Sequence, residues 1–156
     1  MIREIVRGAV AGAAGTTALN AMTYGDMAVR GRPTSSVPEQ MVEKVAAGLG
    51  HPVRGGGWRR DARLTGLGAL GGLAVGTGAG AAMSLARWAG VRMPVWLGGV
   101  VTGALVMATT DLSMARLKVS DPRTWSASDW LSDAVPHLVY GLVTYGIVVA
   151  ADGARA

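Results

Sequence analysis

The sequence predicts an all-α integral membrane protein, with four transmembrane helices and one short amphipathic helix. Three observations predict this class. Half of the 156 residues are hydrophobic. Only 16% are charged, against roughly 25% in an ordinary soluble domain. Three segments, residues 64–86, 93–110 and 134–151, carry no charge. At a rise of ~1.5 Å per residue, each is long enough to cross the ~30 Å hydrocarbon core of a bilayer, or nearly so.

The first transmembrane helix is expected over residues 5–29 and is the least apolar of the four. Arg-Gly-Arg-Pro at positions 30–33 should end it, because proline restricts the residue before it and cannot donate a backbone hydrogen bond. A retained helix is favoured over a cleaved signal peptide, because no convincing small-residue cleavage site follows Arg7. Residues 1–156 are expected to form a single transmembrane domain.

A short amphipathic helix is expected over residues 36–49. Ser36 and Glu39 have the spacing of a capping box, and Gly50 should end the helix. One apolar stripe recurs at intervals of four, at Val37, Met41, Val45 and Leu49. The stripe predicts a helix that packs on the bundle or lies at the membrane surface, with docking of a partner as the alternative.

The remaining transmembrane helices are expected over residues 62–87, 94–115 and 127–151. Four tryptophans lie near the expected helix ends, as in the aromatic belts of membrane proteins: Trp88, Trp96, Trp125 and Trp130. The loop between the first two transmembrane helices and the loop between the last two together carry most of the basic residues. The positive-inside rule therefore predicts a multi-pass protein with both larger loops in the cytoplasm and both termini outside.

The net charge of +5 is interpreted as a sign of topology and of contact with lipid headgroups in the bilayer. Nucleic acid is not an expected partner, because no arginine-rich helix interleaved with aromatics is present. The chain has no cysteine, and it lacks a nucleophile elbow, a phosphate-cradling glycine loop and a zinc-protease motif. We therefore predict that it is not an enzyme, and no cofactor or metal is expected.

Glycines at intervals of four predict close helix packing, because lipid provides no hydrophobic drive between helices and small residues let two backbones approach. The candidate packing residues are Gly8, Gly12, Gly68, Gly72, Gly76, Gly80, Gly99 and Gly103. Such a glycine zipper can hold one bundle together, or it can join copies into a homo-oligomer, with a pore as a further alternative.

A second set of polar residues forms a candidate intramembrane site: Asn20, Asp26, Asp111, Asp129, Asp133, His137 and Tyr140. The four aspartates approach the same membrane side in a four-span topology. Positions 129, 133 and 137 share one helix face. Ionisable groups at membrane depth are costly and often functional, so the set can relay protons or bind a cation.

A structural interpretation of the same residues stays open. Aspartates in the first turns of a helix offset its macrodipole, and Asp26 lies four residues before Arg30, the spacing of a helix ion pair. Asp111 can pair with Arg116 or Lys118. His137 follows a proline, and it can donate to the backbone carbonyl that the proline leaves free.

The segment from Ser128-Asp129-Trp130 to Pro136-His137-Leu138-Val139-Tyr140-Gly141 resembles the last helix of the YagU-like small bacterial inner-membrane proteins. The glycine-rich first helix that ends in Asp26 is similar to related bacterial membrane proteins, although this chain has a longer basic loop after it. The resemblance implies a helical bundle in the bacterial plasma membrane, and it carries over only His137 and its neighbours. We expect a non-enzymatic membrane component that packs with itself or with a larger membrane complex. The alternative is a small transporter or channel for protons or cations.

Overall fold

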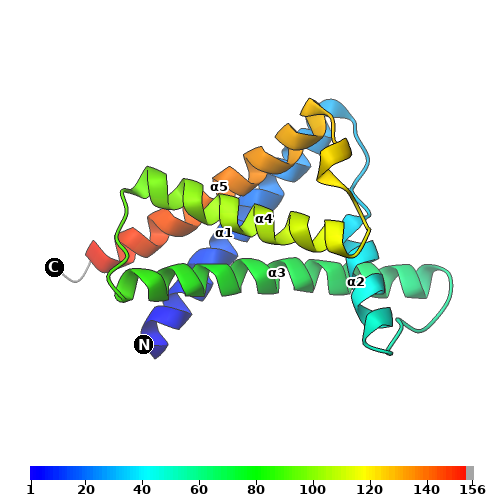
Figure 1. Cartoon of the computed structure of the whole chain (residues 1–156), viewed down its shortest axis with the longest axis horizontal. Coiled ribbons are helices and arrows are strands. Elements are labelled where there is room, and N and C mark those ends of the chain that lie inside the picture. Colours follow the sequence, from blue (N-terminus) through cyan, green and yellow to red (C-terminus); the bar gives the residue numbers. More distant parts are fainter. Residues whose placement is uncertain (154–156) are drawn as a thin grey trace.

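The computed structural model describes residues 1–153, which contain α-helices and one short 3₁₀ helix but no strand (Figure 1). The elements are α1 (Ile2–Arg30), α2 (Val37–Gly48), α3 (Trp58–Trp88), α4 (Val95–Arg116), η1 (Pro122–Thr124) and α5 (Ala127–Gly153). The all-helical fold is therefore confirmed, and each expected helix has a counterpart with ends close to those expected. The last three positions of the expected domain, 154–156, lie outside the described residues.

Three helices are long and apolar enough to cross a membrane: α3, α4, and α5 over Ala127–Asp152. Large apolar side chains point outward along them, and Leu70, Leu105 and Leu131 are each more than half exposed. A helix that is hydrophobic all round needs an apolar solvent. The molecule therefore has the character of a membrane protein. α1 has 29 residues but is not among the helices that reach this hydropathy, so composition does not establish a fourth span.

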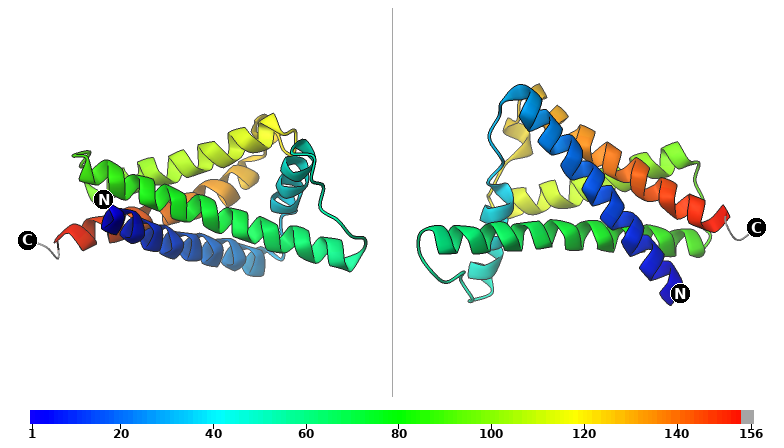
Figure 2. Two further views of the ribbon diagram at one scale, coloured as in Figure 1. Left: turned by 90° about the horizontal axis from the view of Figure 1, so that it is seen from below. Right: turned by 180° about the vertical axis from the view of Figure 1, so that it is seen from behind.

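The helices are arranged so that α1 packs between α3 and α5, and α5 packs between α1 and α4 (Figures 1 and 2). Gly8 lies beside Gly80 and Gly12 beside Gly76, so α1 and α3 are antiparallel. α4 and α5 are antiparallel as well, with Gly103 beside His137. Loops 31–57 and 117–126 consequently lie at one end of the bundle, and the N-terminus and the 89–94 turn lie at the other.

Glycines mark two helix crossings inside the chain. A Cβ at Gly12 would overlap the carbonyl of Gly76, and one at Gly80 would overlap the carbonyl of Gly8. A Cβ at Gly103 would overlap the carbonyl of His137. Two of the expected packing glycines therefore lie on each side of the α1–α3 crossing. Gly99 and Gly103 lie at the α4–α5 crossing, where they meet Leu142 and His137.

The structure differs from the expected glycine series at Gly68 and Gly72. A Cβ at Gly68 would lie 3.0 Å from the Cβ of Pro38 in α2. Apart from the adjoining backbone of α3, no described residue has an atom within 4 Å of a Cβ at Gly72. A step of four residues rotates ~40° around a helix of 3.6 residues per turn, so a long series cannot keep facing one neighbour. Of this series on α3, Gly76, Gly80 and Ser84 are the members that lie against the glycines of α1.

The ends of α1 and α2 can be compared with the helix-ending and capping residues predicted from the sequence. Gly31 has φ of 64° and its N–H donates to the carbonyl of Met27 at 2.9 Å, so α1 ends at this glycine before Pro33 is reached. The prediction of a capping box at the start of α2 is wrong. Ser36 makes no side-chain cap bond there, and the carboxylate of Glu39 instead accepts from Thr65 of α3 at 3.0 Å.

Candidate functional site

Three of the predicted polar residues come together between α4 and α5: Asp111, Asp133 and His137. The close approach of Gly103 to the backbone of His137 brings the two helices within reach of each other. Asp111 is 7% exposed. The side chains of His137 and Asp133 are 12% and 23% exposed, and Nδ1 of His137 lies 3.3 Å from Oδ1 of Asp133. The site is thus a largely buried group of two carboxyls and one imidazole.

We call Asp111, Asp133 and His137 the cluster. It contains two buried carboxyl oxygens without a hydrogen-bond partner, Oδ1 of Asp111 and Oδ2 of Asp133. Asp133 and His137 lie near enough to Asp111 to act on its carboxyl electrostatically, and within the described residues no ion pair joins them to it. Burying a charge or a bare acceptor is costly unless it is paired. A proton on either carboxyl would remove the cost of burying its charge. The arrangement can therefore hold an exchangeable proton.

The imidazole of His137 has a defined orientation. Its Nδ1 lies 2.8 Å from the main-chain oxygen of Asp133, which can only accept, so Nδ1 carries the hydrogen. This corrects the expectation that His137 bonds to the carbonyl freed by Pro136. The amide missing at Pro136 would have bonded to the carbonyl four residues back, that of Ser132. With Nδ1 held in this way, Nε2 is the ring atom that can gain or lose a proton.

Asp26 does not join this cluster, because two arginines hold it. Its carboxylate lies 3.3 Å from Nη1 of Arg30, and it also accepts from Nε of Arg32. The guanidinium of Arg30 donates to the hydroxyls of Ser128 and Ser132, each at 2.9 Å. These bonds tie the end of α1 to the start of α5. The helix ion pair expected at Asp26 is present.

Asp129 caps its own helix. Its Oδ2 accepts from the N–H of Ser126 at 2.9 Å and from the Ser126 hydroxyl, whose oxygen in turn accepts from the N–H of Asp129 at 3.2 Å. This reciprocal capping box engages the carboxyl of Asp129 with Ser126, although Asp129 shares a helix face with Asp133 in the sequence. The carboxyl is used for the helix end rather than for the cluster.

The other predicted residues lie elsewhere. Asn20 is exposed on α1, so it does not face a polar interior. Tyr140 is 1% exposed, and its hydroxyl donates to the carbonyl of Gly76 at 2.7 Å, which joins α5 to α3. Asp111 makes no ion pair with Arg116 or Lys118 within the described residues. The seven residues predicted as one site are therefore divided among several places.

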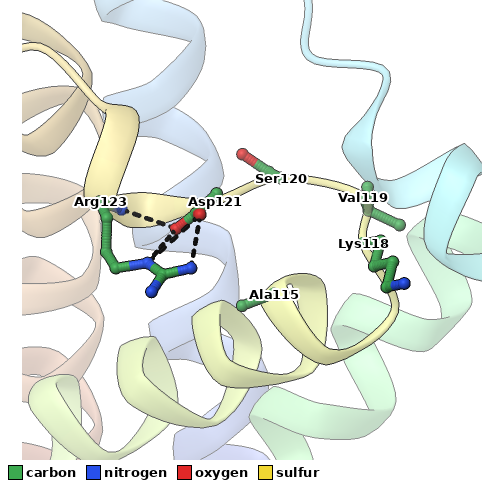
Figure 3. Close-up of a pocket in the computed structure, with 6 residues that line it drawn as sticks. All are labelled: Ala115, Lys118, Val119, Ser120, Asp121 and Arg123. Atoms are coloured by element: carbon green, nitrogen blue, oxygen red, sulfur yellow. Dashed lines mark hydrogen bonds and ion pairs between the residues drawn. The ribbon is translucent and has the colours of Figure 1, made fainter.

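Outside the cluster, a depression of about 410 Å³ lies between the end of α4 and η1 (Figure 3). Asp121 and Arg123 form an ion pair within it, 2.9 Å between Oδ2 and Nη2, and the guanidinium lowers the pKa of Asp121 below its ordinary value. In residues 1–153, no group of three or more His, Asp or Glu side chains is placed to hold a metal ion.

The sequence reasoning missed a polar contact at the opposite end of the bundle. Tyr145 is fully buried, and its hydroxyl accepts from the N–H of Met93 at 3.1 Å and lies 3.4 Å from Nη1 of Arg87. Nε of Arg87 donates to Asp152. These bonds fix the turn between α3 and α4 onto α5. The sequence signal that could have indicated this contact is Arg87, which directly follows the uncharged residues 64–86.

No protein-family model matches this chain, and neither a curated protein nor a solved structure matches it significantly. The resemblance to the YagU-like proteins therefore stays a prediction.

Proposed function

We propose that this chain is a four-span, non-enzymatic membrane protein that takes up and releases protons at Asp111, Asp133 and His137. The fourth span is α1. Residues 8–25 carry no charge, and α1 crosses α3 and packs against α5, which are themselves candidate spans. If these two helices cross the bilayer, the helix packed between them lies in it too. The basic loops 31–57 and 117–126 at one end favour a cytoplasmic position for that end.

The observation that carries the proton function is the pair of buried, unpartnered carboxyl oxygens beside an oriented histidine. Ionisable groups within membrane spans are expensive, and those kept there commonly mark proton or ion pathways. A histidine with Nδ1 fixed can pass a proton through Nε2, and each carboxyl can hold one. We infer a small transporter or channel that moves protons.

The experiment is a proton-flux assay in liposomes that hold the purified protein and an internal pH-sensitive dye, with a potassium diffusion potential as the driving force. Wild type should acidify or alkalinise the lumen faster than protein-free liposomes. Asp111→Asn and His137→Ala should each reduce the rate to that of empty liposomes. Asp121→Asn is the matched control, because it removes a carboxylate that is paired with Arg123 in the exposed loop.

Two results would reject the proposal. A wild-type rate equal to that of empty liposomes would remove proton transport as the function. A wild-type rate that survives both Asp111→Asn and His137→Ala, in protein with unchanged helicity, would show that protons pass without this cluster.

Assembly into a homo-oligomer or a larger membrane complex is the second candidate. It is supported by the outward side of α3, where a Cβ at Gly71, Gly72 or Gly78 would have no atom of the described residues within 4 Å apart from the adjoining backbone of α3. Close approach of another helix is possible at such positions. Native mass spectrometry of wild type and Gly72→Leu tests it: a defined oligomer that becomes monomeric on substitution supports assembly. A monomeric wild type excludes a homo-oligomer under those conditions.

A further inference from the structure

The position of α2 relative to the membrane follows from its contacts with α3. Thr65 of α3 donates to Glu39 at 3.0 Å, and Pro38 packs on Gly68. The uncharged segment of α3 begins at Leu64, directly after Arg63. α2 therefore touches α3 at the level where its apolar part begins. α2 runs across α3 rather than along it (Figures 1 and 2). With α3 crossing a bilayer, α2 would therefore lie in the plane of the membrane interface.

The acidic side chains of α2 are turned toward α3. Besides the bond between Glu39 and Thr65, Glu43 pairs with Arg60. Val45 and Leu49 are left 46% and 71% exposed. The carboxylates of α2 are thus engaged by its neighbouring helix, while apolar side chains stay available to the acyl-chain boundary of a bilayer.

The basic side chains around this contact have no acidic partner. Within residues 1–153, no ion pair is formed by Lys44, Arg54, Arg59 or Arg63. Trp58 is 74% exposed, with the guanidinium of Arg59 5.4 Å from its ring centroid. An exposed tryptophan next to an unpaired arginine at the start of a span is typical of the headgroup layer.

We propose that α2 and the first two turns of α3 form a binding surface for anionic phospholipid headgroups, which we call the α2–α3 surface. Its recognition chemistry is charge complementarity. Unpaired lysine and arginine side chains at the interface face the phosphates, and guanidinium groups donate paired hydrogen bonds to phosphate oxygens. The exposed Val45 and Leu49 lie beside the acyl chains. This inference is independent of the proton cluster, because it requires only that α3 spans the membrane.

The test is lipid binding to the purified, detergent-solubilised chain, measured by native mass spectrometry during titration with phosphatidylglycerol or phosphatidylcholine. Wild type should bind phosphatidylglycerol more tightly. Lys44→Gln with Arg59→Gln should weaken that binding about 25-fold, because each cation near a lipid surface contributes about a fivefold change. The control pair is Arg3→Gln with Arg92→Gln, which removes the same charge from exposed positions at the other end.

The control pair should change the dissociation constant less than twofold. An equal loss in both pairs would show that net charge alone governs binding, and it would overturn a specific surface. Equal wild-type affinity for phosphatidylcholine would overturn it as well. Lys44 makes no described ion pair or hydrogen bond and Arg59 only stacks on Trp58, so helicity by circular dichroism should match wild type in both pairs.

Discussion

The α1–α3 crossing offers a controlled test of the packing, because α3 carries two glycines in opposite surroundings. A Cβ at Gly80 would overlap the carbonyl of Gly8 and the backbone of Gly12, whereas a Cβ at Gly72 meets nothing within 4 Å. Gly80→Ala therefore forces the two helices about 1 Å apart or distorts them, at a typical overpacking cost of about 1–3 kcal/mol. Gly72→Ala gains helix propensity, up to about 1 kcal/mol, at no such cost.

Both substitutions add the same methyl group to the same helix, so the propensity gain cancels in their difference. That difference, about 1–3 kcal/mol, is the packing contribution alone. It can be measured by unfolding each variant in mixed micelles with increasing sodium dodecyl sulfate, followed by far-ultraviolet circular dichroism. Equal midpoints for Gly80→Ala and Gly72→Ala would refute the close crossing of α1 and α3.

Two further predictions concern hydrogen bonds outside the cluster. Ser126→Ala should lower the free energy of unfolding by about 1 kcal/mol, because it removes a reciprocal cap, whereas Ser36→Ala should change it by less than about 0.5 kcal/mol, since Ser36 makes no cap bond. Tyr145→Phe should cost about 1 kcal/mol by removing the bond from Met93, and Tyr24→Phe, on an exposed ring, is its control. The same micelle unfolding measures each pair, and equal effects within either pair would contradict the bond assigned there.

The helices could be predicted because the signals for them are local. Uncharged runs bounded by charged residues set the approximate ends of α3, α4 and α5, and glycine or proline set the ends of α1 and α2. The capping boxes show the limit of such signals. Ser36 and Glu39 have the required spacing, yet Glu39 bonds to Thr65, while the box at Ser126 and Asp129 was overlooked. A carboxylate takes the best available donor, and tertiary packing decides which donor is in reach.

The candidate site could be predicted only in part, for a related reason. The i, i+4 spacing of Asp133 and His137 was enough to place them together on α5, but it placed Asp129 there as well. The position of Asp111 relative to Asp133 and His137 depends on the register between α4 and α5, in which Gly103 lies against the backbone of His137. No sequence pattern on α4 specifies that register. Helix faces are readable from spacing, whereas the register of one helix against another is set by packing.

The position of α1 in the bundle rests on packing against its neighbours rather than on its own hydropathy. The helix is not apolar enough to count as a span by composition, but its glycines let it approach α3 and α5 closely. In lipid, close backbone contact and interhelical hydrogen bonds drive association, and here they include the bonds from Arg30 to Ser128 and Ser132. If α1 is the fourth span proposed above, its insertion depends on these neighbours. The glycines that make α1 weakly hydrophobic are the residues that allow those neighbours to hold it.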